Sequence, residues 1–370
     1  MTHNGGDLGA EAAQRAQGVV GWYGDPQSAW SIGVDLTFAE GVDPEALAGG
    51  WARACSAYPH LGEPGRVRIV AEHDFEAAKP ETLARAYTAG EPLVRLLVSE
   101  SGRRLLVVAH HGAVDGLGLL GLAGEVTGKR FTSAARGIGD RPARRGFVLS
   151  AMRRVWEAVT SPPGRFPGSG EAGSTAEDLH GLDYPARRLG TAGICEAALK
   201  AHRTAAAGRR RPILMVGASR RDGARLAPDR DTAYLRLRPT RKEQSGEALA
   251  RLLASIPPEP AFPETSSGGI GPAVVGLLRS RLGGTCLISN LGVVSAEGLE
   301  VVRMYPAPSG PQAVAVGLAS TGAVTAVTVR TRRQDFTLEE SSGSGRTWLR
   351  GWSDSVALSR GRTASRARSG

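Results

Sequence analysis

An apolar run that ends in two histidines constrains this chain more than any other segment. Residues 105–109 predict a fully buried strand, and His110 and His111 follow it directly. Side chains alternate along a strand, so we expect one imidazole to face a cleft and the other to pack inside. Asp115-Gly116 then predicts a tight turn with a carboxylate near the histidines. A bare His-His pair usually only packs, but this complete spacing behind a strand favours a site in which a neutral imidazole accepts a proton.

Strand and helix patterns alternate along the rest of the chain. Asp43 and Pro44 are typical of a helix start, and Pro59 ends that helix. Residues 161–181, rich in proline, glycine and serine, predict a linker that divides the chain. Strands are predicted at 30–39, 67–70, 93–98, 213–218, 232–237, 286–289, 313–319 and 324–330, and helices at 44–57, 117–125, 147–159, 191–206 and 241–256.

The charge of the chain limits its partners. Its 370 residues include 46 lysines and arginines against 36 acidic residues, a net charge of +10. Such a chain can attract nucleic acid, coenzyme phosphates or an acidic carrier protein, or it can simply spread arginines over a soluble surface. No nucleic-acid motif or aromatic-basic stripe is present, so we expect no nucleic-acid partner. The arginine-rich tail, 353–370, is expected to be disordered.

Several other site types are excluded by spacing. Cys55, Cys195 and Cys286 lie far apart without CxxC spacing, which excludes a disulfide framework or a zinc or iron–sulfur site. We expect Cys195 and Cys286 to be buried, and no metal site. Residues 268–272 are glycine-rich but lack the P-loop lysine, so a phosphate site is not expected there. Without a signal peptide or an apolar run of about 18 residues, the expected location is the cytoplasm, with no membrane span.

The segment from His110 to Gly116 resembles the HHxxxDG motif of the superfamily that contains condensation domains and chloramphenicol-acetyltransferase-like acyltransferases. That superfamily includes peptide-synthetase condensation domains, polyketide-associated acyltransferases and wax ester synthases. Other segments resemble theirs in order and spacing and together cover most of residues 30–330: DPEAL (43–47), YPHL (58–61), EPLVR (91–95), LGTA (189–192), VGASRR (216–221) and SNLG (289–292).

Three departures from the superfamily patterns narrow the resemblance. Gly118 stands where many relatives have serine. Residues 190–195 lack the Asn-Asp pair that is frequent in the wax ester synthase branch, and the DFGWG motif of the BAHD branch is absent. The chain is also shorter than most relatives, so we expect some loops to be trimmed.

The resemblance implies an α+β fold made of two chloramphenicol-acetyltransferase-like lobes that meet in a V around a tunnel. The N-terminal lobe with the motif is expected over 1–160 and a linker over 161–184. The C-terminal lobe is expected over 185–352, followed by the tail at 353–370.

The resemblance also implies roles for the motif. His111 would be the general base, which takes the proton of an acceptor amine or hydroxyl as it attacks a thioester carbonyl. His110 is expected to be structural. Asp115 is expected to pair with an arginine rather than to act on the base, with Arg221 as the first candidate and Arg220 as the second.

Further residues are candidates for binding. Backbone N–H groups near Gly116 would stabilise the oxyanion. Ser289 and Asn290 either face the tunnel from the second lobe or form an ordinary turn. The basic run with Arg141, Arg144 and Arg145 either lines the donor entrance or is a solvated loop, two interpretations that the sequence leaves open.

The implied function is acyl transfer from coenzyme A or a carrier-protein thioester to an amine or hydroxyl of a small-molecule acceptor, in natural-product or lipid biosynthesis. No bound cofactor and no covalent acyl-enzyme are expected; acyl-CoA or a phosphopantetheinyl thioester is a co-substrate. An acyl or peptidyl carrier protein is the candidate protein partner. Two alternatives stay open: a fold repurposed for cyclisation or another reaction on a tethered intermediate, and an inactive interaction module of an assembly line.

Overall fold

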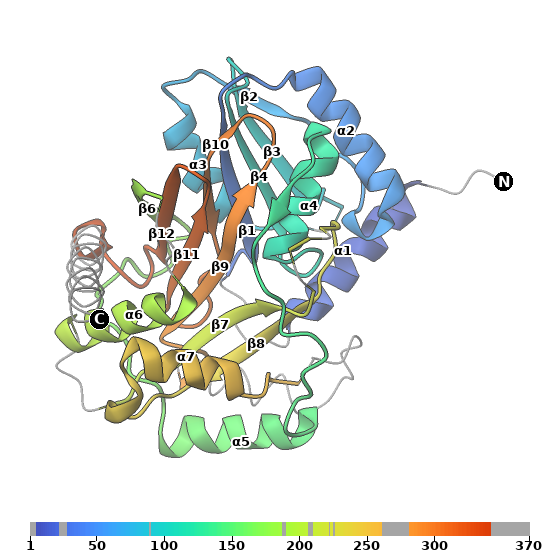
Figure 1. Ribbon diagram of the computed structural model, residues 1–370. Coiled ribbons are helices and arrows are strands. Elements are labelled where there is room, and N and C mark those ends of the chain that lie inside the picture. The colour runs from blue at the N-terminus through green and yellow to red at the C-terminus, as the bar shows by residue number, and fades with distance from the viewer. Residues whose placement is uncertain are drawn as a thin grey trace.

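Two mixed β-sheets form the centre of the protein (Figure 1). The computed structural model describes residues 5–21, 28–88, 90–186, 190–205, 210–221, 223–224, 226–260 and 281–341. In the first sheet the strand order is β10-β1-β4-β3-β2; in the second it is β6-β12-β11-β9-β7-β8, with β5 paired to β9. This is the mixed α and β fold class that the sequence predicts.

The first sheet carries the histidine motif at the end of β4. Strand β4 lies between β1 and β3, antiparallel to both, and its apolar residues are buried on both faces because alternate side chains enter two different core clusters. The strands of this sheet are β1 (Ser31–Phe38), β2 (Arg68–Val70), β3 (Val94–Ser99), β4 (Arg104–His110) and β10 (Leu299–Tyr305).

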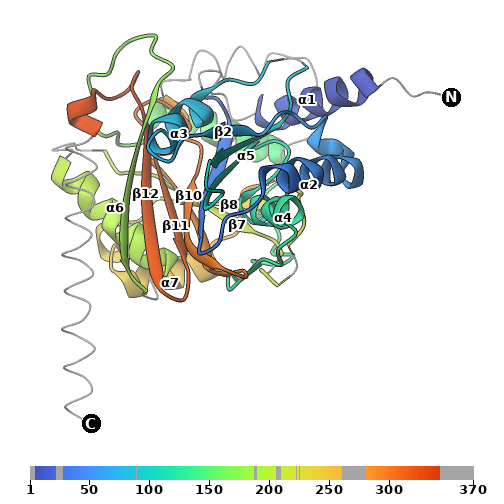
Figure 2. The same cartoon turned by 90° about the horizontal axis from the view of Figure 1, so that it is seen from above.

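The helices of the N-terminal part pack around this sheet. The Asp43 side chain caps α2 as predicted, by accepting from the Glu45 N–H at 3.1 Å. Helices α2 and α4 lie side by side (Figures 1 and 2). The elements are α1 (Gly5–Gly21), α2 (Pro44–Ala57), η1 (Pro59–Leu61), α3 (Phe75–Ala84) and α4 (Gly116–Thr127).

The second sheet is built mainly from the C-terminal half of the chain, and α6 and α7 pack on it (Figure 1). Strand β11 is buried along its whole length because β9 and β12 flank it. The elements are β5 (Thr132–Ser133), α5 (Phe147–Thr160), β6 (Glu177–Pro185), α6 (Thr191–Ala205), β7 (Leu214–Ser219), β8 (Thr232–Leu237), η2 (Arg241–Glu243), α7 (Gly246–Ser255), β9 (Cys286–Ser295), β11 (Val314–Ser320) and β12 (Val324–Arg332).

The chain is not divided as simply as 1–160, 161–184 and 185–352. Glu177–Pro185, inside the expected linker, is strand β6, because its backbone pairs antiparallel with all nine residues of β12. Strand β10 comes from the C-terminal part but pairs with β1, so it completes the first sheet. Helices α1 and α3 were not predicted either. The tail 353–370 and the glycine-rich stretch 268–272 lie outside the described residues.

The three cysteines lie in the described part of the chain. Cys55, Cys195 and Cys286 are buried and unpaired, as expected for Cys195 and Cys286. Burial raises the pKa of the Cys195 thiol to about 12, which makes it unreactive. Among the described residues no cluster of potential metal ligands occurs, and no helix is long and apolar enough to cross a membrane.

Candidate active site

The two motif histidines have separate surroundings. The His110 ring stacks edge-on against Tyr87 at 5.0 Å between centroids, and its Nδ1 accepts from the Gly112 N–H at 3.1 Å. Burial lowers the pKa of His110 to about 3. His110 lines neither of the two large cavities, whereas His111 lines both. The divergence predicted from strand alternation is therefore present.

The hydrogen bonds of His111 define its tautomer. Its Nδ1 lies 3.1 Å from the Val114 carbonyl oxygen, which can only accept, so Nδ1 carries the proton. Its Nε2 lies 2.6 Å from the Tyr234 hydroxyl and accepts a hydrogen bond from it. Burial lowers the pKa of His111 to about 4, so the ring is neutral at pH 7. The basic lone pair of His111 is thus on Nε2, at the cavity.

Asp115 connects the motif to the second sheet. Its carboxylate accepts from Arg221 Nη2 at 3.2 Å, as predicted, and Arg220 instead donates to the backbone of 139–141. It also accepts from the Asp231 N–H and the Thr232 hydroxyl, both at 2.8 Å. A fourth donor, the Gly118 N–H at 2.7 Å, makes Asp115 the N-cap of α4. The carboxylate makes no hydrogen bond to His111 in the structure; it connects the start of α4 to β8.

Gly118 is explained by the same junction. A Cβ at this position would lie 2.0 Å from the Asp229 carbonyl oxygen. The loop before β8 packs so closely on α4 that the serine found in many relatives would not fit here.

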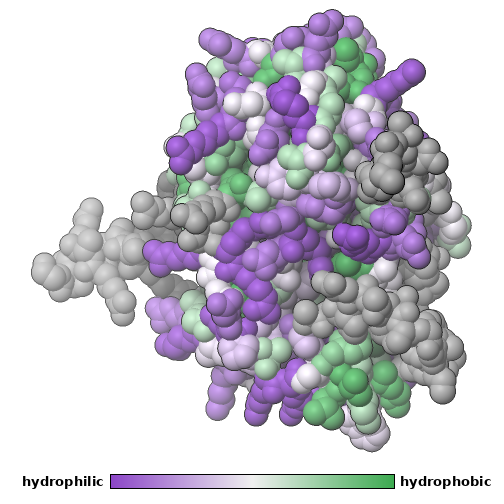
Figure 3. Space-filling view, turned by 90° about the vertical axis from the view of Figure 1, so that its right-hand side faces the viewer, coloured by the Kyte–Doolittle hydropathy of each residue, from purple (hydrophilic) through white to green (hydrophobic). Residues whose placement is uncertain are grey.

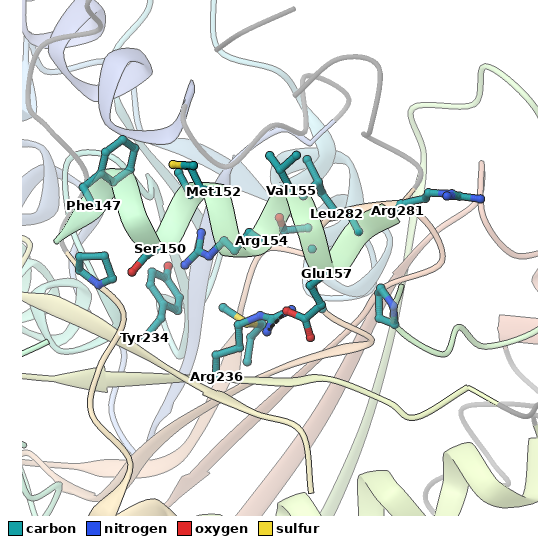
Figure 4. Close-up of a pocket in the computed structure, with 18 of the residues that line it drawn as sticks. Phe147, Ser150, Met152, Arg154, Val155, Glu157, Tyr234, Arg236, Arg281 and Leu282 are labelled. Carbon is teal, nitrogen blue, oxygen red and sulfur yellow. Dashed lines mark ion pairs between the residues drawn. The ribbon is translucent and has the colours of Figure 1, made fainter. Parts of the chain in front are cut away.

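One face of β8 lies along the site, although the sequence did not indicate it. Side chains two residues apart share a strand face, and Thr232, Tyr234 and Arg236 do so here. Thr232 contacts Asp115, Tyr234 contacts His111, and Arg236 pairs with Glu157 of α5 at 2.6 Å. Figure 4 shows Tyr234 and Arg236 pointing from β8 toward α5. The sequence predicted this segment only as a strand, 232–237, because the residues that its side chains contact are more than 70 positions away in the chain.

Two large cavities adjoin at His111. The first, of about 650 Å³, lies between α5, β8 and residues 281–284; the second, of about 620 Å³, lies between α4, β7, β8 and β9. Both are lined by His111, Tyr234, Leu287 and Ala307. A neutral base between two cavities can receive one reactant from each side.

The first cavity is mainly apolar. Helix α5 lines it, and hydrophobic side chains gather at the lower end of the molecule in Figure 3, where α5 lies in Figure 1. The large apolar side chains of α5 that remain exposed are Val148, Leu149, Met152, Trp156 and Val159.

Ser289, Asn290 and Gly116 all line the second cavity. Asn290 uses its amide locally: its Oδ1 accepts from the Gly292 N–H at 2.8 Å, and its Nδ2 donates to Thr191 at 3.1 Å. Gly292 has a φ of +71°, so Asn290 supports a turn at the wall of this cavity. Gly116 begins α4 opposite Ser289 and Leu291, which places the start of this helix at the cavity wall.

The three arginines of the basic run do not share one cavity. Arg141 lines the second cavity and donates to the carbonyls of Leu253 and Ile256 at 3.1 and 3.0 Å. Arg144 and Arg145 instead line a smaller cavity of about 220 Å³, which shares Arg154 and Arg236 with the first cavity.

Comparisons with known proteins support the fold. No family model and no curated protein matches the sequence. The first condensation domain of the calcium-dependent antibiotic synthetase, in complex with a substrate analogue, is similar over 94% of this chain and 96% of that chain, with 15% identity and a TM-score of 0.57. A mutant starter condensation domain of rhizomide synthetase, in complex with C8-CoA and Leu-SNAC, is similar over 94% of both chains, with 13% identity and a TM-score of 0.54. The chain therefore has the condensation-domain fold, as the motif predicted.

Proposed function

We propose that this protein transfers an acyl group from a thioester, on coenzyme A or a carrier protein, to an amine or hydroxyl of a small-molecule acceptor. The observation that carries the proposal is the neutral His111, whose Nε2 lone pair lies where two cavities adjoin. Fold alone does not determine function, and this geometry supplies the chemical argument. The similar rhizomide synthetase domain was solved with C8-CoA, which agrees with a thioester donor.

In the proposed reaction the acceptor attacks the thioester carbonyl while its proton passes to His111. The tetrahedral intermediate then releases the thiolate, which takes the proton back, so that no acyl group is attached to the protein. A positioned base of this kind typically contributes about 10²–10⁴-fold to the rate. The helix start at Gly116 is the candidate for oxyanion stabilisation, because the N–H groups of a first helical turn point beyond the N-terminal end of the helix and have no partner within it.

The test supplies a panel of acyl-CoAs and acylated carrier proteins together with amines and alcohols, and detects products by mass spectrometry. Release of free thiol should match product formed, and the intact mass of the protein should stay unchanged. A stable acyl adduct on the protein would contradict direct transfer, and no turnover across the panel would contradict the proposed function.

A further inference from the structure

The atom of His111 that must act as the base is already hydrogen-bonded. With its proton on Nδ1, His111 has its lone pair on Nε2, and the Tyr234 hydroxyl lies 2.6 Å from that atom. A general base that removes a proton directly lies about 2.6–3.2 Å from the heavy atom that carries the proton. The Tyr234 oxygen therefore occupies the position that an acceptor would need for direct contact with His111.

Tyr234 is held in this position from several sides. It is buried, with 9% of its surface exposed. Its backbone pairs with Gly217 of β7, and its carbonyl accepts from the Glu259 N–H at 2.8 Å. Its neighbours on the same strand face are bound as well, Thr232 by Asp115 and Arg236 by Glu157. These contacts fix the strand that carries the phenol, so the backbone of Tyr234 is held beside His111.

Tyr234 lines both cavities, as does His111, to which its hydroxyl is bonded. A phenol oxygen donates one hydrogen bond and accepts two, so it can receive a proton from a substrate while it donates to His111. An acceptor in either cavity can therefore reach the base through Tyr234 without displacing it.

We propose that Tyr234 is a catalytic residue that relays the acceptor proton to His111. The acceptor N–H or O–H gives its proton to the Tyr234 oxygen while the Tyr234 proton moves to His111 Nε2. The acceptor forms its new bond to the thioester carbonyl carbon. When the carbon–sulfur bond breaks, the thiolate takes a proton from Tyr234, and His111 returns its proton to Tyr234. The net change is one proton from acceptor to thiol, with both side chains restored.

This relay rests on the proposed acyl transfer, so the experiment begins with turnover of the wild-type protein. Tyr234→Phe removes the hydroxyl and should lower kcat by about 10²–10⁴-fold, the range for loss of a general base. Because the two groups act as a unit, the variant that combines His111→Ala with Tyr234→Phe should lose no more than His111→Ala alone. Tyr305→Phe is the control. It removes another buried tyrosine hydroxyl, which lies on β10 near Lys79, and should keep the wild-type kcat.

Fluorotyrosine at position 234 separates a relay from a structural role. Ring fluorination makes the phenol more acidic with little change in size, so a relay should show a displaced pH profile of kcat, whereas a merely structural hydroxyl should not. A kcat of Tyr234→Phe near the wild-type value, or an unchanged profile with fluorotyrosine, would overturn the relay. A higher kcat would also overturn it and would mean that the hydroxyl blocks the base. Absence of wild-type turnover would instead reject the proposed function, and the relay with it.

Discussion

Two arginines reach from the second sheet to the first at different places in the molecule. Arg221, just after β7, binds Asp115 beside the cavities, and its side chain is 15% exposed. Arg330, on β12, is fully buried and lines neither large cavity. It pairs with Glu177 of β6 at 2.7 Å and donates to the Ser31 carbonyl and hydroxyl of β1, both at 2.8 Å.

The difference between these two contacts shows how one junction serves two purposes. Arg330 makes no contact with His111, Asp115 or Tyr234, so we expect its main contribution to be to stability. Asp115 binds Arg221 together with the Asp231 N–H and the Thr232 hydroxyl, and so sets the position of β8 relative to the histidine motif. We therefore expect changes at Asp115 to reach the chemistry and changes at Arg330 to spare it.

The largest effect is expected at His111, the proposed base, which lies next to the Asp115 contact. His111→Ala should lower kcat by about 10²–10⁴-fold, because the proton of the acceptor then has no basic imidazole as its final acceptor, and should leave the circular dichroism spectrum unchanged. The measurement is kcat with a substrate pair found in the panel. A kcat near the wild-type value would remove His111 as the base and favour a non-catalytic role for this fold.

Breaking the distant contact should cost stability alone. Arg330→Met leaves Glu177 buried without its partner, and the free energy of unfolding in urea should fall by about 3–5 kcal/mol. The kcat of the folded fraction should stay at the wild-type value. Adding Glu177→Gln should recover part of the loss, because the unpaired charge is then gone. A large fall in kcat would contradict the division between the two contacts.

Asp115→Ala should lower both quantities. Displacement of β8 by the loss of its carboxylate partner should reduce kcat by about 10²-fold, the cost of misplacing a reacting group. The loss of unfolding free energy should be smaller than for Arg330→Met, because Arg221 is partly exposed and keeps an ion pair with Asp229. A wild-type kcat in Asp115→Ala, with a reduced melting temperature, would mean that the Asp115 contact contributes only to stability, as is expected for Arg330.

The histidine at the junction also predicts a pH dependence of stability. The pKa of His111 is about 4 in the folded chain, against about 6.5 when unfolded, so the unfolded state binds the extra proton between these values. Stability should therefore fall as pH drops, for this group by about 2 kcal/mol between about pH 6.5 and pH 5. Unfolding of the wild type and His111→Gln at both pH values isolates the contribution. Equal slopes for the two proteins would contradict the burial of a neutral ring.

The smallest effect is expected outside the junction, at the smaller cavity. Arg144 and Arg145 are exposed, and we propose that they attract the phosphates of the donor. Changing both to glutamate should raise the donor KM a few-fold at low salt and leave kcat unchanged; the effect should shrink at high salt, because ions screen exposed charges. Arg141→Ala, at the second cavity, is the matched comparison. An unchanged donor KM would place the donor elsewhere.

Local patterns in the sequence were sufficient for much of the fold. The apolar run before His110 predicted β4, and the Asp43 cap predicted α2, because an apolar run and a helix cap can be recognised from residues that are neighbours in the chain. Strand alternation predicted that His110 and His111 diverge, and the family resemblance implied that Asp115 meets an arginine, with Arg221 as the first candidate. The roles of these residues remain predictions until turnover is measured.

What the tertiary structure decided concerns residues that are distant in sequence. Tyr234 reaches His111 across 123 positions, β10 crosses to the first sheet, and β6 arises in the expected linker because β12 offers it an edge. A tyrosine in a predicted strand has no local sign of the imidazole that it will face. Strand pairing between distant segments sets such contacts, and the local pattern of residues within one strand does not show which other strand it will pair with.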